Sequence, residues 1–394
     1  MEEPMRPAIR GAAILAGSAL ALSLATPALA APATGTVLYA NSAAAIDGSY
    51  VVVFKSGDAD RPRADRLTKR YGGNVTRVFG SAVEGYTAKL SAAQAARLAA
   101  DPAVASVEAD QVVRIAGTQT SAPWGLDRID QRALPLNGTY TYGASSGVTV
   151  YVVDTGITIT HQDFGGRASY GYDAVDGDNI AQDGNGHGTF VAGVAAGSTY
   201  GVAKSANVVG VRVLDNNGSG TTAGVIAGID WVTANAAPGR SVANLSLGGG
   251  ASSTLDAAVR RSITAGIPYT IAAGNSGVNA SNTSPARVTE ALTVGATSNT
   301  DAKASWSNYG SVLDLFAPGV SITSAWRTSD TATYTGSGTS FAAPHVAGAV
   351  ALYLAANPGA PVSTVNAAIV NNATTGVVTS RGTGSPNRLL YVGS

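Results

Sequence analysis

The sequence predicts an α/β fold of three layers, in which a mostly parallel central sheet is covered by helices on both faces. Continuous apolar runs such as 148–154, 207–214 and 241–247 alternate with helical stretches such as 221–236 and 252–266. Strands that are apolar throughout are buried on both faces, which is typical of a parallel sheet between two helical layers. The 48 glycines fit the many tight turns that such a fold needs.

A smaller α+β module of ferredoxin-like type is predicted to precede this domain. Its expected elements are, in order, a strand at 50–55, a helix at 58–70, two strands within 74–90, a helix at 91–102 and a strand at 104–115. The β-α-β-β-α-β order is that of the ferredoxin-like fold. Ser91 and Gln94 have the spacing of a capping box, which marks the start of the second helix. Residues 31–48 are expected to form a linker.

The N-terminal 30 residues have the pattern of a secretory signal peptide. Arg6 and Arg10 precede an apolar stretch at 11–25, and small residues end at Ala30, after which cleavage is expected. No later apolar run of the sequence reaches the length of a membrane span. We therefore expect a secreted, extracellular product without a membrane anchor.

Composition excludes several classes of function. The 25 Lys and Arg residues balance 25 Asp and Glu, and no basic block occurs, which argues against a nucleic-acid partner. The chain has no cysteine, so disulfides, a thiol nucleophile and cysteine-ligated zinc are excluded. With three histidines a multi-histidine metal site is not expected, and a bound cation would be a hard ion held by oxygen ligands.

Four polar residues occur where a strand ends or a helix begins. Asp154 ends the strand of VVDTG, Asn275 follows the strand IPYTIAA, His187 stands in the glycine-rich turn DGNGHG, and Ser340 opens the apolar helix of GSGTSFAAPHVAG. Active sites of parallel sheets lie beyond the carboxyl ends of the strands, so these side chains are expected to converge. Acyl transfer needs an alcohol nucleophile, a base, an orienting carboxylate and an oxyanion donor, and the four residues supply these parts.

Each of these residues also has a structural interpretation, which the sequence leaves open at this point. Asp154 is also a turn former, His187 a buried histidine and Ser340 a helix cap. Two other enzyme classes are rejected. An aspartic protease needs a second DTG or DSG loop, which the chain lacks. The G-x-S-x-G match at 143–147 precedes a strand instead of following one, which excludes an α/β-hydrolase elbow.

The helix that begins near Ser340 carries two further predictions. Pro344 is expected in its first turn, because proline is tolerated there and breaks a helix further in. His345 is expected to pack in the core. The remaining histidine, His161, is expected in a surface loop.

At these motifs the chain resembles the subtilisin-like serine proteases, and among them the proteinase K group. The similarity covers nearly all of residues 117–394 and rests on the long motifs VVDTGI, DGNGHGTFVAG, NLSLGGG, AAGNSG, SNYGSVLDLFAPG and GTSFAAPHVAG. Residues 50–115 resemble the family's inhibitory propeptide. The resemblance implies a propeptide at 31–116, a catalytic domain of subtilisin-like fold at 117–394, and a secreted serine endopeptidase that processes itself near Ala116–Gly117.

The resemblance also implies roles for the site residues. Ser340 would be the nucleophile, His187 the general base and then acid, Asp154 its orienting carboxylate, and Asn275 a donor to the oxyanion. Two edge segments would hold an extended protein or peptide substrate and a third would wall the S1 pocket; these residues are Gly218, Ser219, Gly220, Ser246, Leu247, Gly248, Ala272, Ala273 and Gly274. None of them is charged, so apolar or aromatic P1 residues and broad tolerance are expected.

Structural calcium is the cofactor that the resemblance implies. The candidate ligands are Asp314 with carbonyls near Thr289 and Ala291, and a second loop that contains Asp127, Asp130 and Gln131. Phe190 and Phe341 depart from the residues usual in the family, and they are expected to tune activity without abolishing it.

The chain's own propeptide is the expected partner, as an intramolecular chaperone and inhibitor whose tail Val112–Ala116 lies in the substrate cleft. A monomer is expected. The rival hypothesis is a catalytically silent binding protein on the same scaffold. It is disfavoured because no member of the triad is missing. An esterase is disfavoured by the failed elbow context.

Overall fold

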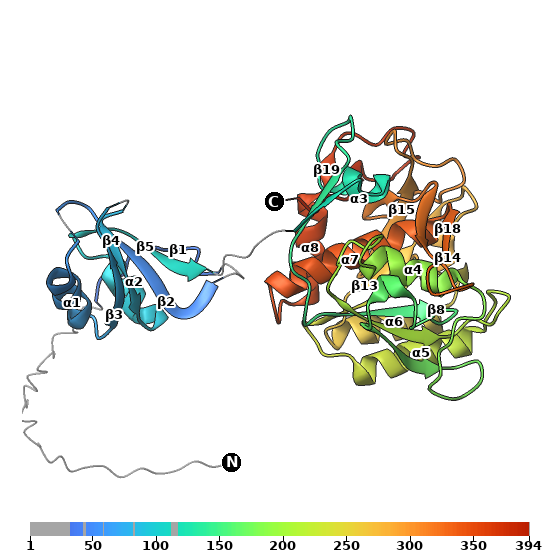
Figure 1. The fold of residues 1–394 in the computed structure, drawn as a ribbon, viewed down its shortest axis with the longest axis horizontal. Helices are drawn as coiled ribbons and strands as arrows, with labels where there is room; N and C mark the ends of the chain where they lie inside the picture. The colour runs from blue at the N-terminus through green and yellow to red at the C-terminus, as the bar shows by residue number, and fades with distance from the viewer. Residues whose placement is uncertain (1–31, 42–44, 58, 82, 112–116, 394) are drawn as a thin grey trace, which may run out of the picture. The chain divides into compact units, whose positions relative to one another are not determined.

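The structure is a computed structural model. It describes residues 32–41, 45–57, 59–81, 83–111 and 117–393. Contacts divide the chain into two units, one centred on Asp47–Ala109 and the other on Asp110–Ser394 (Figure 1). The predicted signal peptide and the predicted cleft-binding tail lie outside the described residues.

The first unit has the predicted β-α-β-β-α-β order. Its elements are β2 (Ala45–Phe54), α1 (Arg61–Arg70), β3 (Asn74–Phe79), β4 (Gly85–Lys89), α2 (Ala92–Ala99) and β5 (Val104–Gln111). The sheet order is β5-β2-β4-β3, and a short strand β1 (Val37–Leu38) pairs in parallel with β5. Ser91 and Gln94 form the predicted capping box at the start of α2. Part of the stretch expected to be a linker is therefore in the sheet, as β1 and the start of β2.

A nine-stranded sheet forms the centre of the second unit. Its strands are β8 (Thr149–Asp154), β9 (Ala168–Asp173), β10 (Asn207–Arg212), β11 (Ser241–Leu245), β13 (Tyr269–Ala272), β15 (Leu292–Thr297), β16 (Leu315–Pro318), β19 (Thr374–Thr375) and β20 (Arg388–Leu389). The spatial order is β19-β20-β16-β15-β13-β11-β8-β10-β9. All neighbours are parallel except β19 and β20, which confirms the predicted mostly parallel sheet.

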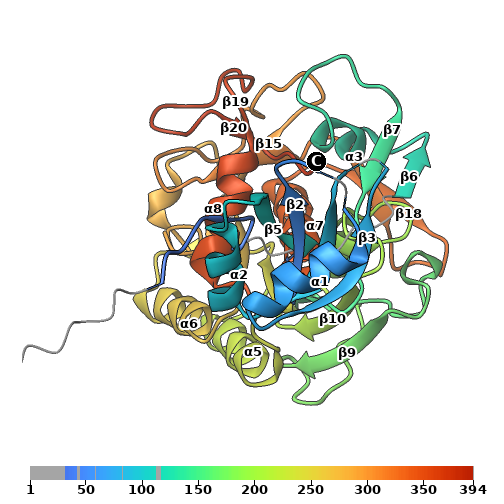
Figure 2. The ribbon, with the colours of Figure 1, turned by 90° about the vertical axis from the view of Figure 1, so that its left-hand side faces the viewer.

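Helices cover both faces of this sheet and complete the three layers. They are α3 (Trp124–Ile129), α4 (His187–Ala196), α5 (Thr222–Asn235), α6 (Ser253–Thr264), α7 (Thr339–Ala356) and α8 (Val362–Asn372). In β8, Val150 and Val152 pack into the core formed with α4 and α7, whereas Tyr151 and Val153 pack into the core formed with α5 and α6. Helices α5 and α6 lie side by side on their face (Figures 1 and 2).

Three short antiparallel pairs and two 3₁₀ turns complete the second unit. They are β6 (Gly117–Thr120) with β7 (Thr139–Tyr142), β12 (Gly249–Gly250) with β14 (Thr283–Ser284), β17 (Ile322–Ala325) with β18 (Thr333–Gly336), and the turns η1 (Gln162–Phe164) and η2 (Ala280–Asn282). The β17–β18 hairpin packs against α4 and so borders the N-terminus at which His187 lies.

Helix α7 is the central helix of the second unit. By length and composition alone it is apolar enough to cross a membrane, but 72% of it is buried inside the domain, as expected of a core helix. Pro344 lies inside α7, five residues beyond the first residue Thr339, and not in the first turn as predicted. The helix accommodates the proline because the carbonyl that it leaves without a helical donor, that of Ser340, accepts a hydrogen bond from Ser246.

A buried ion pair joins α3 to the loop after β15. Nε and Nη2 of Arg128 donate to the two carboxylate oxygens of Asp301 at 2.7 and 3.0 Å, and the Arg128 side chain is 1% exposed. Breaking a buried pair by removing one partner leaves an uncompensated charge, whereas an exposed pair contributes little. Loss of either partner alone is therefore expected to destabilise the unit.

We expect Asp301→Ala to destabilise the second unit by roughly 3–5 kcal/mol, because Arg128 keeps its charge and loses the carboxylate that pairs with it. The thermal midpoint, followed by circular dichroism, should fall by about 10 °C. Arg260→Ala, which breaks the exposed pair between Arg260 and Glu290, is the matched control and should shift the midpoint by less than about 3 °C. Equal shifts in the two variants would contradict the assignment.

Candidate active site

The four residues singled out in the sequence lie at the carboxyl edge of the central sheet. Asp154 is the last residue of β8, and His187 is the first residue of α4. Asn275 follows β13, and Ser340 is the second residue of α7. Hydrogen bonds join these segments in pairs, β8 to α4 and the Asn275 loop to α7.

Asp154 and His187 form a hydrogen-bonded pair. Nδ1 of His187 lies 2.7 Å from Oδ1 of Asp154, whose side chain is 0% exposed against 26% for His187. Burial acts to lower the pKa of His187. The charge of Asp154, its hydrogen bond and the charge of Asp183 outweigh that effect, so the pKa of His187 is raised. The pair fixes the imidazole and leaves Nε2 as the nitrogen that is available to act as a base.

Asp183 holds the turn that presents His187. Its Oδ1 accepts the N–H groups of Asn185 and Gly186 and the hydroxyl of Thr155, and its Oδ2 accepts the N–H and hydroxyl of Thr189. One buried carboxylate thus ties together the end of β8, the turn and the first turn of α4. This role was not predicted from the sequence, although an acidic residue four positions before His187 was a visible signal.

Ser340 does not cap its helix. The N-cap position belongs to Gly338, which makes no side-chain cap, and the hydroxyl of Ser340 donates to the carbonyl of Ser246 at 3.1 Å. The structural interpretation of Ser340 as a cap is therefore wrong. Among the described residues no hydrogen bond joins this hydroxyl to His187. Such contacts are often long before substrate binds, and rotation about one bond brings Oγ to a new acceptor.

The side chain of Asn275 is oriented by Thr339. Oδ1 of Asn275 accepts both the N–H and the hydroxyl of Thr339 at 2.8 Å, and Nδ2 donates to no other group within the described parts of the chain. A methyl group built at Gly338 would lie 3.6 Å from the Ser340 nitrogen and 3.7 Å from Nδ2 of Asn275. Two N–H donors therefore border one small space, which glycine keeps open, and such an arrangement can stabilise an oxyanion.

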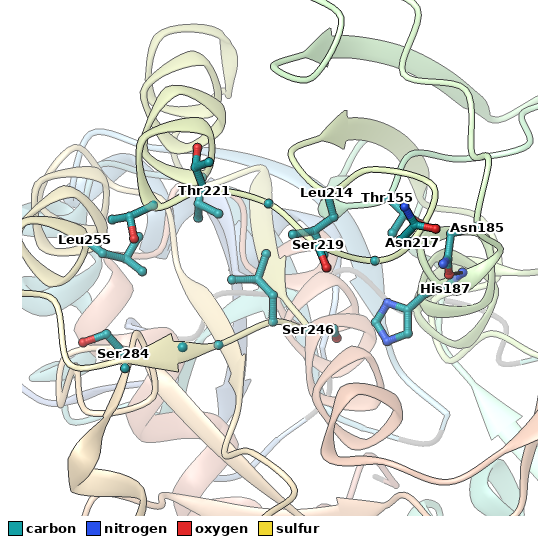
Figure 3. Close-up of a pocket in the computed structure, with 18 residues that line it drawn as sticks. Thr155, Asn185, His187, Leu214, Asn217, Ser219, Thr221, Ser246, Leu255 and Ser284 are labelled. Carbon is teal, nitrogen blue, oxygen red and sulfur yellow. Dashed lines mark hydrogen bonds between the residues drawn. The ribbon is translucent and has the colours of Figure 1, made fainter.

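The predicted substrate-binding segments line two adjoining hollows. The first, of about 550 Å³, has His187 at one end and Leu255 and Ser284 at the other, with Ser219 and Ser246 on opposing sides (Figure 3). The second, of about 420 Å³, contains Ser340 and Asn275. The structure places Gly218, Ser219 and Gly220 along the first hollow, Ala272, Ala273 and Gly274 along the second, and Ser246, Leu247 and Gly248 along both.

Two of the residues that depart from the family pattern, Phe190 and Phe341, pack against each other beside His187. The ring centres of Phe190 and Phe341 are 4.0 Å apart, and Phe341 lies 5.6 Å from the ring of His187. Both phenylalanines are buried, and Trp326 and Tyr334 extend the cluster. Together the two phenylalanines form an apolar support for the imidazole of His187. The contact between them could not be predicted from either residue alone.

The structure brings Asp314 next to the segment that holds Thr289 and Ala291. Oδ2 of Asp314 accepts the N–H of Thr293 at 2.8 Å. Burial raises the pKa of Asp314 to about 6, although that hydrogen bond and the charge of Arg388 act to lower it. A partly buried carboxylate with so little compensation fits a cation, and carboxylate and carbonyl oxygens are the ligands that calcium prefers.

The second predicted calcium loop is held largely by its own backbone. Asp127 accepts the N–H groups of Asn137 and Gly138, and the amide of Gln131 donates to two carbonyls of the loop. Burial and the charge of Asp127 raise the pKa of Asp130, whose Oδ1 is buried without a hydrogen-bond partner among the described residues. Among the residues that the structure describes, no three His, Cys, Asp or Glu side chains cluster. Calcium would therefore need carbonyl ligands both at Asp314 and at the second loop.

The other two histidines lie in the core. His345 is buried as predicted, with Nδ1 bonded to the carbonyl of Phe341, and burial lowers its pKa to about 4. His161 was expected at the surface, and that prediction is wrong. It is 3% exposed, its Nδ1 accepts the N–H of Asp163, and its Nε2 bonds to the carbonyl of Ala332 from the β17–β18 hairpin.

Comparison with known proteins agrees with this geometry. Residues 145–390 match the model of the subtilase family, and residues 49–116 match that of peptidase inhibitor I9. The chain is 52% identical over 369 residues to an extracellular serine proteinase of Thermus sp. (strain Rt41A), which covers 88% of this chain and 90% of the relative. It is 48% identical to alkaline serine exoprotease A of Vibrio alginolyticus over 90% of this chain and 69% of the relative.

A solved structure gives the same result. The crystal structure of a cold-adapted subtilisin-like serine proteinase matches with a TM-score of 0.68 and 52% identity, over 70% of this chain and all of the other. The names of the two relatives support the predicted extracellular location. The chain therefore belongs to the subtilase family of serine proteases, as a subtilisin-like endopeptidase with an inhibitor I9 propeptide.

Proposed function

We propose that the chain hydrolyses peptide bonds through an acyl-enzyme, with Ser340 as nucleophile, His187 as base and Asp154 as its orienting carboxylate. The observation that carries the proposal is the 2.7 Å contact between His187 and Asp154 at the sheet edge where α7 presents Ser340. Oγ of Ser340 attacks the carbonyl carbon while Nε2 of His187 takes its proton. The C–N bond then breaks, and His187 returns the proton to the leaving amine. Water repeats the sequence and releases the new carboxylate.

The same proposal assigns the remaining groups of the site. Nδ2 of Asn275 and the N–H of Ser340 stabilise the oxyanion, and the segments 218–220 and 246–248 clasp an extended substrate by strand addition. The wall at 272–274 is apolar and small, which supports apolar or aromatic P1 residues. We place the chain in the proteinase K group, with a particular similarity to aqualysin I, and expect a monomer with neither nucleic-acid nor membrane partners.

The I9 unit supports maturation from a proenzyme. We propose that residues 31–116 assist folding and then inhibit, and that cleavage occurs near Ala116–Gly117 after removal of a signal peptide at Ala30. Structural calcium is proposed at Asp314 with the carbonyls of Thr289 and Ala291, supported by the partly buried carboxylate with a raised pKa described above. A second ion at Asp127, Asp130 and Gln131 is supported by the unpartnered oxygen of Asp130.

Ser340→Ala should keep its propeptide, because cleavage needs the nucleophile. The intact mass of the purified wild type should correspond to a chain that begins near Gly117, whereas the variant should retain the I9 unit. If both proteins are shortened alike, another protease matures the chain. If both keep the propeptide although folded, the catalytically silent scaffold becomes the better interpretation.

Asp154→Asn should lower kcat by about 10⁴, because the imidazole loses the group that fixes its tautomer. Activity needs neutral His187, so it is present above the raised pKa and is lost as the pH falls through it. The variant removes the main cause of the rise, and its acid limb should therefore move to lower pH. Asp230→Asn, at an exposed position of α5, is the control. An acid limb at the same pH in Asp154→Asn and wild type would contradict the assignment.

Removal of calcium with a chelator should lower the thermal midpoint of the inhibited enzyme. An ion present at about 100 times its Kd contributes about 2.7 kcal/mol, which corresponds to a shift of roughly 5–10 °C in a domain of this size. Asp314→Asn should lose the part of this response that the ion at Asp314 contributes, and Asp230→Asn should keep the whole response. A full calcium response in Asp314→Asn would refute the site.

A further inference from the structure

Pro344 removes one hydrogen bond from the helix that carries the nucleophile. In an α-helix the N–H of each residue donates to the carbonyl four residues earlier, so residue 344 is the partner of Ser340. Proline has no N–H, and its place inside α7 therefore leaves the carbonyl of Ser340 without a helical donor. This carbonyl lies at a partly buried position, where an unpaired acceptor is costly.

Ser246 supplies the missing donor from another element. Its hydroxyl donates to the carbonyl of Ser340 at 2.7 Å, and the residue is 4% exposed. In the opposite direction the hydroxyl of Ser340 donates to the carbonyl of Ser246 at 3.1 Å. The two residues, 94 positions apart in sequence, are thus joined by two hydrogen bonds.

The hydroxyl of Ser246 is itself held by a buried chain of polar groups. Nδ2 of Asn244 donates to Oγ of Ser246 at 2.8 Å, and the hydroxyl of Thr270 donates to Oδ1 of Asn244 at 2.9 Å. Asn244 and Thr270 are 0% exposed and lie on the neighbouring strands β11 and β13. Because Oγ accepts from Asn244, its own proton is directed to Ser340.

We propose that Thr270, Asn244 and Ser246 are positioning residues that fix the backbone of the nucleophile through the carbonyl that Pro344 leaves free. The inference rests on the proposed role of Ser340. Burying a polar side chain inside a parallel sheet costs free energy unless the side chain forms hydrogen bonds. Here Thr270 donates to Asn244, Asn244 donates to Ser246, and Ser246 donates to Ser340. A displacement of Ser340 would move both its Oγ and its N–H, which are the nucleophile and an oxyanion donor. Small displacements of such groups have large effects on rate.

The test is a double-mutant cycle in the full-length chain, matured by its own propeptide. Ser246→Ala removes the hydroxyl and keeps the backbone that borders the substrate groove, and Pro344→Ala restores an N–H that can reach the carbonyl of Ser340. Ser324→Ala is the matched control, since its buried hydroxyl donates to the carbonyl of Phe190 in α4 at 2.9 Å. Active enzyme is counted with a fluorophosphonate, and kcat and KM are measured on a peptide anilide.

We expect Ser246→Ala to lower kcat about tenfold with KM changed less than twofold, because one positioning bond is lost. In the Pro344→Ala background the same substitution should lower kcat less than about twofold, because the helix then supplies the donor. Ser324→Ala should leave both constants unchanged. If Ser246→Ala is not recovered, Thr270→Val, which keeps the shape of the side chain, should lower kcat about two- to threefold.

Two results would overturn the inference while the proposed function stands. One is a wild type labelled at Ser340 together with an unchanged kcat in Ser246→Ala or, where that variant is not recovered, in Thr270→Val. The other is an equal loss from Ser246→Ala in both backgrounds. A wild type that the fluorophosphonate does not label at Ser340 would overturn the proposed function, and the inference with it. If the variants are not processed, the rate of propeptide release followed by intact mass replaces kcat in the same cycle.

Discussion

The parallel sheet is the constraint on which the site depends. Its strands run in one direction, so the loops that leave β8, β11 and β13 all emerge at the same edge, and helices α4 and α7 begin there. Asp154, His187, Asn275 and Ser340 are far apart in the chain and are brought together by this arrangement. The two cores on either side of the sheet hold its strands in register, and therefore hold the site.

Backbone groups near the edge are fixed by side chains from other segments. Asp183 ties the His187 turn to β8, Thr339 orients Asn275, and Ser246 bonds the carbonyl of Ser340. The resulting site is polar around Asp154 and His187 and apolar beside the imidazole, where Phe190 and Phe341 pack. The buried carboxylate of Asp154 lies beside the partly exposed imidazole of His187 and raises its pKa.

The sequence predicted the two units, the parallel sheet and the capping box, because apolar periodicity and turn chemistry are local signals. Asp154 and Asn275 could be placed at the edge of the sheet from the sequence alone, because each stands at or just after the end of a predicted strand. The roles of Asp183, Thr339 and the Ser246 hydroxyl could not, since each depends on a contact between segments distant in sequence. His161 was misplaced for the same reason, because the hairpin that buries it follows about 170 residues later. Pro344 was predicted in the first turn but lies further inside the helix. The helix tolerates it there because the hydroxyl of Ser246 donates to the carbonyl of Ser340, in place of the N–H that proline lacks.

The burial of α7 has a consequence for how the enzyme loses activity on heating. Ser340, the proposed nucleophile, is the second residue of a helix that belongs to the main core, so we expect the site to open only when the domain itself opens. Loss of activity on heating therefore reports cooperative unfolding of the whole domain. Unfolded chains become substrates for those that remain folded, so the working lifetime is set by the rate of unfolding and not by an equilibrium.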